Sequence, residues 1–159
     1  MTDFEDIYNR YAPQIYRVCM GYTNDSDQAK DLVQETFIAV WKNLGSFRNE
    51  SSISTWIFRI ATNNCLRALE KANRVQVSEL PAHLPDPVSE SPDERLGYLH
   101  RAIAELGESE RIIISLVLED LPQAEIAAIV GISHANIRVK VHRIKEKLAQ
   151  KLKAHGQFN

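Results

Sequence analysis

Apolar residues recur every three or four positions along almost the whole chain, and this spacing restricts the fold more than any other feature of the sequence. Such a period places apolar side chains on one face of a helix, whereas a strand needs alternating apolar and polar residues. The sequence has no sustained alternation and no Asn-Gly or Asp-Gly hairpin, so it predicts an all-α fold. The expected helices cover about residues 3–20, 26–44, 52–69, 93–106, 109–119, 122–130 and 133–155.

A proline-rich segment divides these helices into two groups. Residues 75–92 hold four prolines together with serine and acidic residues, a composition typical of a linker. We therefore expect two small helical domains joined by a flexible linker. The N-terminal domain would have three to four helices at residues 1–74, and the C-terminal domain would have four helices at residues 93–159.

Glycines and polar residues mark the ends of the N-terminal helices. Gly21 and the polar run after it are expected to end the first helix, and Asp25 or the serine after it to cap the second. Gly45 is expected to end the second helix, and Ser52 or the serine before it to open the third. The inner side of the second helix is expected to carry Leu32, Val33, Phe37, Val40, Trp41 and Leu44.

The charged residues are distributed unevenly, although the net charge is only −2. Residues 51–74 hold four basic side chains and one acidic, and residues 138–155 hold seven basic and one acidic. Between them, residues 75–110 hold two basic and eight acidic side chains. Two separated basic segments suggest two contacts with a polyanion. The alternative is that these charges only solubilise exposed helix faces, and charge alone does not decide between the two.

Several classes of protein receive no support from the sequence. Cys19 and Cys65 lie in apolar, helix-like contexts and are expected to be buried free thiols rather than a disulfide. No apolar run approaches the ~18 residues that span a bilayer, and the acidic N-terminus is unlike a signal peptide, so we expect a cytoplasmic protein. His83 and His100 have no partners at metal-ligand spacing. We expect no metal, no cofactor, no small-molecule substrate and no catalysis.

Residues 122–148, PQAEIAAIVGISHANIRVKVHRIKEKL, have the layout of a helix-turn-helix. Pro122 suits the first turn of a short helix, Gly131 suits a tight turn, and Ser133 suits the N-cap of the next helix. Basic residues cover one side of that next helix, as expected of a recognition helix that enters the major groove. The alternative is a helical hairpin with a solvated basic face. The apolar stripe on the other side consists of Ile137, Val141, Ile144, Leu148 and Leu152.

Two further motifs carry a resemblance to a known family. Residues 31–37 read DLVQETF, followed by Trp41, and residues 47–63 read FRNESSISTWIFRIATN. Together they resemble region 2 of the extracytoplasmic-function (ECF) sigma factors, a minimal group in the sigma-70 family. The segment GISHANIRVKVHRIKEKL resembles region 4 of the same group. The resemblance implies a subunit that gives bacterial RNA polymerase its promoter specificity, and it covers roughly residues 3–73 and 93–153.

The resemblance also implies a role for individual residues. Positions that dock on the clamp helices of the largest polymerase subunit are matched by Asp31, Leu32, Gln34 and Glu35. A second group of residues matches the loop that captures unpaired bases of the −10 element and the helix beside that loop. These residues are Arg48, Asn49, Ser51, Ser52, Thr55, Trp56, Arg59, Asn63 and Arg67. Positions at the helix that reads the −35 element are matched by Ser133, Asn136, Arg138, Val139, Lys140, His142 and Arg143. The implied partners are core RNA polymerase, promoter DNA and an anti-sigma factor.

The chemistry of these residues agrees with the implied roles. Opening a DNA duplex costs free energy because base stacking is lost. A pocket that holds an extruded base, together with contacts to phosphates, must offset this cost. Asp31 and Glu35 are four residues apart and so share a helix face that suits a basic partner, although a solvated face is the alternative. Trp56 is expected to be largely buried and to support the loop that captures bases.

The sequence departs from the usual pattern of the family at several positions. Asn49 stands where glycine is common, and Val139 stands where a small polar residue is common. Ala135 and Asn136 replace a frequent Gly-Thr pair. These changes leave the promoter consensus open. Three alternatives are a regulator that binds duplex DNA without polymerase, a small helical enzyme, and a sigma-like interaction module.

Overall fold

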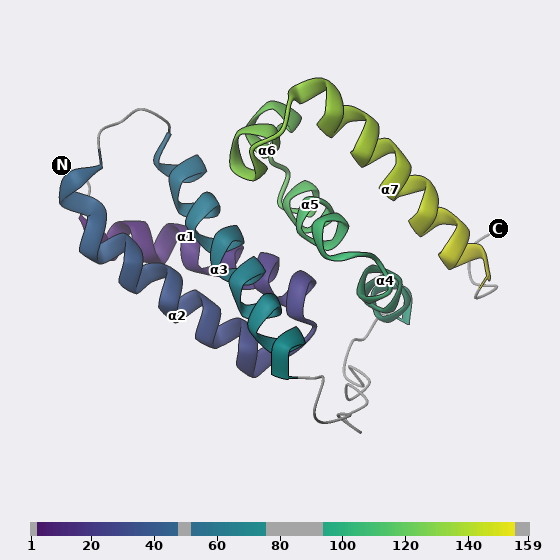
Figure 1. The fold of residues 1–159 in the computed structure, drawn as a ribbon, viewed down its shortest axis with the longest axis horizontal. Coiled ribbons are helices and arrows are strands. Elements are labelled where there is room, and N and C mark those ends of the chain that lie inside the picture. Colours follow the sequence, from purple (N-terminus) through teal and green to yellow (C-terminus); the bar gives the residue numbers. More distant parts are fainter. Residues whose placement is uncertain (1–2, 48–51, 76–93, 155–159) are drawn as a thin grey trace.

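The computed structural model describes residues 3–47, 52–75 and 94–154. Within these ranges the chain forms α-helices and one short 3-10 helix and contains no strand, so the all-α prediction is confirmed (Figure 1). The elements are α1 (Phe4–Thr23), α2 (Ser26–Asn43), η1 (Leu44–Ser46), α3 (Ile53–Val75), α4 (Glu94–Ala104), α5 (Glu108–Leu118), α6 (Gln123–Val130) and α7 (His134–Ala154).

The helices form two groups that pack against each other. Helices α1, α2 and α3 contact one another in the N-terminal group, and α4, α5 and α6 surround one side of α7 in the C-terminal group. Figure 1 shows α5 and α6 on the side of the C-terminal group that faces α1 and α3, and α7 on its far side. The sequence predicts the two groups, but it contains no signal for their contact.

The N-terminal helices end largely where the polar residues predict, with one exception. The Asp25 carboxylate caps α2 by accepting hydrogen bonds from the backbone N–H groups of Asp27 and Gln28, at 2.9 and 3.2 Å. The first helix does not end at Gly21, because α1 continues to Thr23. It ends in the polar run that was expected to end it, at Asn24, whose φ is 54°. Gly21 lies inside α1, where the lack of a side chain leaves room for Ser115 of α5 instead of ending the helix.

The turn between α6 and α7 has the expected geometry. Gly131 has a φ of 80°, which glycine adopts without strain, and the Ser133 hydroxyl accepts a hydrogen bond from the backbone N–H of Asn136 at 3.1 Å. Pro122 differs slightly from the prediction. It precedes α6 with extended backbone (φ −61°, ψ 147°) and so stands at the N-cap rather than in the first turn.

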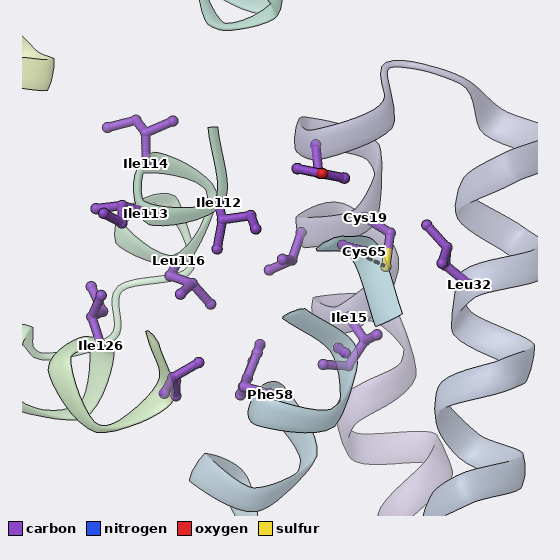
Figure 2. Packing of buried hydrophobic residues seen from close by; sticks show 14 of the residues in the cluster. Ile15, Cys19, Leu32, Phe58, Cys65, Ile112, Ile113, Ile114, Leu116 and Ile126 are labelled. Carbon is purple, nitrogen blue, oxygen red and sulfur yellow. Dashed lines mark hydrogen bonds between the residues drawn. The ribbon is translucent and has the colours of Figure 1, made fainter. Parts of the chain in front are cut away.

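One continuous apolar core fills both groups and the space between them. Figure 2 shows Phe58 of α3 on the side of the N-terminal group toward Leu116 of α5 and Ile126 of α6, all of them buried. The predicted stripe of α7 is buried from Ile137 to Leu148. On α2 the prediction fails for Trp41, which is 65 % exposed. Trp41 lies seven positions after Gln34, which is two helical turns, and therefore shares its outer face.

Cys19 of α1 and Cys65 of α3 are buried free thiols, as predicted (Figure 2). Their sulfurs are 3.8 Å apart, with the Cys65 thiol donating to Cys19. This hydrogen bond and the burial of the side chain raise the pKa of Cys65, so the reactive thiolate does not form at neutral pH. The two thiols therefore act as small apolar side chains in the core.

We expect neither cysteine to react with a thiol reagent such as Ellman's reagent while the protein is folded at pH 7. The reagent needs a thiolate that is accessible to solvent, whereas both side chains are fully buried and the pKa of Cys65 is raised. After unfolding in guanidinium chloride, both thiols should react at once. Rapid release of chromophore from the native protein would contradict the burial of this pair.

Candidate nucleic-acid and polymerase interfaces

The outer face of α2 presents the polar residues of the DLVQETF motif. Asp31, Gln34 and Glu35 are exposed side by side, because positions three and four residues apart share a helix face. Leu32 does not belong to this surface. It is 4 % exposed and packs inward, so it supports the face and is no direct contact for a partner.

An apolar groove of about 850 Å³ lies beside these polar residues, between α1 and α2. Its edge is formed by Tyr8, Ile38 and Trp41, which are 44, 51 and 65 % exposed. The Tyr8 ring packs edge-on against Phe37, with the ring centroids 4.9 Å apart. Sequence reasoning placed Trp41 in the core and overlooked Tyr8 and Ile38 as surface residues. The signal for Ile38 was its position seven residues after Asp31, on the same helix face.

The start of α3 carries the first described residues of the predicted −10 site, while Arg48, Asn49 and Ser51 lie outside the described residues. Ser52 caps the helix, since its hydroxyl accepts from the backbone N–H of Thr55 at 3.1 Å and donates to the Thr55 hydroxyl at 2.9 Å. Thr55 is only 6 % exposed. Trp56 packs partly buried against the core, as expected, and stacks on Phe47 with the ring centroids 4.8 Å apart.

Polar residues continue down one face of α3 at steps of four. Arg59, Asn63 and Arg67 are all exposed and follow the direction of the helix axis. Arg67 donates to the Asn64 side-chain oxygen at 2.6 Å. Arg59 donates to the backbone carbonyl of Ala128, in α6, at 2.7 Å. The two predicted −10 residues nearest α6, Thr55 and Arg59, are thus engaged by the C-terminal group.

The outer face of α7 is open. Arg138, Val139, His142 and Arg143 are exposed on the side opposite the buried stripe. The His142 imidazole lies 3.0 Å from the Glu146 carboxylate. Among the residues that the structure describes, Arg138 and Arg143 have no carboxylate partner, so both guanidinium groups are available to an external anion.

The remaining predicted residues of this helix have different surroundings. Ser133 is committed to capping α7, and Asn136 is exposed in its first turn. Lys140 lies toward the N-terminal group, beside Asn63 and Leu66, where the two groups enclose a small cavity of about 200 Å³. The order of the side chains around α7 therefore separates an open, solvent-facing side from a side that faces the N-terminal group.

Two features are absent from the described ranges. No three His, Cys, Asp or Glu residues come close enough together there to hold a metal ion. None of the helices there has the length and apolarity to cross a membrane.

The fold and its open basic helix define a helix-turn-helix DNA-binding protein. The Sigma-70 region 2 family matches residues 7–75, and the Sigma-70 region 4 family matches residues 96–148. The chain is 30 % identical to the RNA polymerase sigma factor CarQ of Myxococcus xanthus, with 94 % of this chain and 88 % of that relative covered. It is 28 % identical to the ECF sigma factor SigE of Mycolicibacterium smegmatis, where 98 % of this chain spans 64 % of the relative.

A solved structure has the same arrangement of helices. The sigma factor RpoE of Bartonella quintana, determined in complex with the anti-sigma factor NepR, superposes with a TM-score of 0.81 at 25 % identity over 96 % of this chain and 98 % of RpoE. The chain belongs to the ECF sigma factors of the sigma-70 family. Its function is promoter recognition and transcription initiation with RNA polymerase, which confirms the expectation from the sequence motifs.

Proposed function

We propose that the two helix groups divide the work of promoter recognition between them. The N-terminal group, with residues 1–74 as its domain, binds core polymerase through α2 and the −10 element through α3. The C-terminal group, residues 93–159, binds the −35 element through α7, and residues 75–92 join the two. The observation that supports this division is the pair of open polar surfaces, acidic on α2 and basic on α7.

The −35 contact is assigned to four side chains of α7. Arg138 and Arg143 can each donate two hydrogen bonds to the O6 and N7 atoms of a guanine, or pair with a phosphate. Val139 offers an apolar contact of the kind that a thymine methyl accepts. His142 lies between them on the same face and donates to a base or a phosphate.

The −10 contact is assigned to the start and the polar face of α3. Arg59 and Arg67 supply positive charge for the backbone, and Ser52 and Asn63 supply hydrogen bonds for base edges. Trp56 holds the start of the preceding loop through its stack on Phe47. The loop residues Arg48, Asn49 and Ser51, and the neighbouring Thr55, complete this proposed site.

The polymerase contact is assigned to Asp31, Gln34 and Glu35. Their carboxylates and amide suit basic and polar groups on the clamp helices of the largest subunit, and the groove beside them offers apolar area to the same partner. Because the clamp helices belong to RNA polymerase, which is a cytoplasmic enzyme, we place the protein in the cytoplasm. The chain supplies recognition, and the polymerase supplies the catalysis.

Changing Gln34 and Glu35 to alanine together tests the polymerase contact. We expect at least a tenfold loss of association with core polymerase, because a hydrogen bond to a charged group contributes about 1.5–3 kcal/mol. A pull-down with tagged chain and purified core measures this loss. Glu70→Ala removes one exposed carboxylate from α3 and serves as the charge control. Normal association by a folded double variant would remove α2 from the interface.

We further propose that an anti-sigma factor holds this chain inactive. The support is the similarity in arrangement to RpoE, which was determined with such a partner. The groove between α1 and α2 offers that partner apolar surface next to the proposed polymerase contact.

A further inference from the structure

The small cavity beside Lys140 lies where α3, α5, α6 and α7 meet, and it has a volume of about 200 Å³. Its apolar walls include Leu66 of α3, Ile112 and Ile113 of α5, and Ile129 of α6. Close-packed protein interiors leave few voids larger than a water molecule, so a cavity of this size is unusual. An apolar cavity of about 150 Å³ holds benzene, and this one therefore has room for an aromatic ring with a short substituent.

The cavity is apolar inside and polar at its mouth. The isoleucines of α5 and α6 that line it are buried, whereas the polar lining residues Asn63, Ser109 and Lys140 are exposed. Thr62 is the buried exception, and its hydroxyl donates to the backbone carbonyl of Arg59 at 3.1 Å. Apolar walls with a few polar groups at one end are typical of sites for small amphipathic molecules.

The charge at the mouth is positive. Lys140 is the only charged residue among the described residues that line the cavity. No carboxylate in the described part of the chain forms an ion pair with its ammonium group. Glu110 attracts Lys140 only at longer range, because its carboxylate pairs with Lys147 at 2.8 Å. A positive charge without a counter-charge favours a ligand that carries an anionic group.

Polar contacts between the helix groups hold the walls of the cavity in place. The Glu125 carboxylate of α6 accepts hydrogen bonds from the hydroxyls of Ser54 and Thr55 in α3, at 2.9 and 3.3 Å. The Arg17 guanidinium of α1 donates to both carboxylate oxygens of Glu119 at 2.7–3.0 Å. The cavity is therefore formed before a ligand arrives, and binding does not have to order its walls.

We propose that this cavity binds a small aromatic carboxylate, with the ring among the isoleucines and the carboxylate at the Lys140 ammonium. The Asn63 amide and the Ser109 hydroxyl supply further hydrogen-bond donors at the mouth. The volume excludes a long acyl chain or a nucleotide, and the charge disfavours a cation. None of the four side chains assigned to the −35 element is among the described residues that line the cavity, so the site is separate from that contact.

A titration of the full-length chain with para-fluorobenzoate, followed by fluorine NMR of the ligand, tests the site. We expect saturable binding with a Kd of about 1 mM or lower, as is usual for a ligand of this size in a formed cavity. Two probes separate the two parts of the ligand. Para-fluorobenzyl alcohol keeps the ring without the charge, fluoroacetate keeps the charge without the ring, and each should bind at least about tenfold more weakly.

Variants locate the bound probe. Lys140→Gln should weaken binding of para-fluorobenzoate at least about tenfold, since it removes the charged donor. Lys145→Gln is the matched control, because it removes the same charge from an exposed position of α7 outside the cavity lining, and it should bind like wild type. Leu66→Trp should abolish binding by filling the mouth, and because Leu66 is 38 % exposed the fold should tolerate it, as circular dichroism would verify.

Three results would overturn the proposal. The first is the absence of saturable binding up to about 10 mM para-fluorobenzoate. The second is equal affinity for the benzoate and the alcohol, which would remove the carboxylate from the assignment. The third is equal affinity of the two lysine variants, or wild-type affinity of a folded Leu66→Trp, because the probe would then lie elsewhere on the protein.

Discussion

Replacing Arg143 with alanine is expected to lower affinity for −35 duplex DNA by about 1–3 kcal/mol, or roughly five- to 150-fold. Arg143 is exposed in the middle of α7, next to Val139 and His142, and has no carboxylate partner among the described residues. Its guanidinium is therefore free to donate two hydrogen bonds to a guanine edge. Fluorescence anisotropy with a labelled promoter duplex measures the loss.

The salt dependence of binding distinguishes a base contact from a phosphate contact. If Arg143 pairs with a phosphate, the slope of log K against log salt should fall by about one, and the loss should be the same for every sequence. Lys153→Ala is the matched control, because it removes the same charge about 15 Å further along the helix. Equal affinities of Arg143→Ala and wild type would exclude α7 from the −35 site as assigned here.

Replacing Phe58 with alanine is expected to lower the free energy of unfolding by about 3–5 kcal/mol. The Phe58 side chain is fully buried between the helix groups, where its removal leaves a cavity that neighbouring helices fill only in part. A loss of this size is a large share of the roughly 5–15 kcal/mol that stabilises a domain. Urea unfolding followed by far-ultraviolet circular dichroism gives the change.

Trp41 supplies the matched control for this experiment. It is also a large aromatic residue of the N-terminal group, but it is 65 % exposed, so Trp41→Ala should change stability by about 0.5 kcal/mol or less. If Phe58→Ala and Trp41→Ala had the same free energy of unfolding, Phe58 would not lie in a close-packed core. The space between the groups would then be open to water.

The sequence predicts the helices well because their determinants are local. The capping carboxylate of Asp25, the glycine turn at Gly131 and the Ser133 cap each act within four residues, and all three behave as expected. The apolar stripe of α7 is equally local, since helical geometry alone brings its members together. These features also determine the outer face of α7, and with it most of the candidate −35 site.

The contact between the helix groups could not be predicted, because its determinants lie far apart in the chain. Gly21 was interpreted, together with the polar run after it, as a helix end, yet it lies inside α1 in close contact with Ser115, a residue on α5. Glu119 and Glu125 carry no sequence signal of their own and gain their roles only opposite Arg17 and Thr55. Periodicity shows that a face is apolar or polar, but not which distant element covers it.

Run-off transcription tests the central claim most directly. The purified chain would be added to bacterial core polymerase lacking other sigma factors, with a library of fragments from the source genome as template. The account predicts transcripts that start at defined sites only when the chain is present, and their upstream sequences would reveal the −10 and −35 elements. A chain that neither binds core nor starts transcripts, and yet binds duplex DNA by itself, would contradict the account.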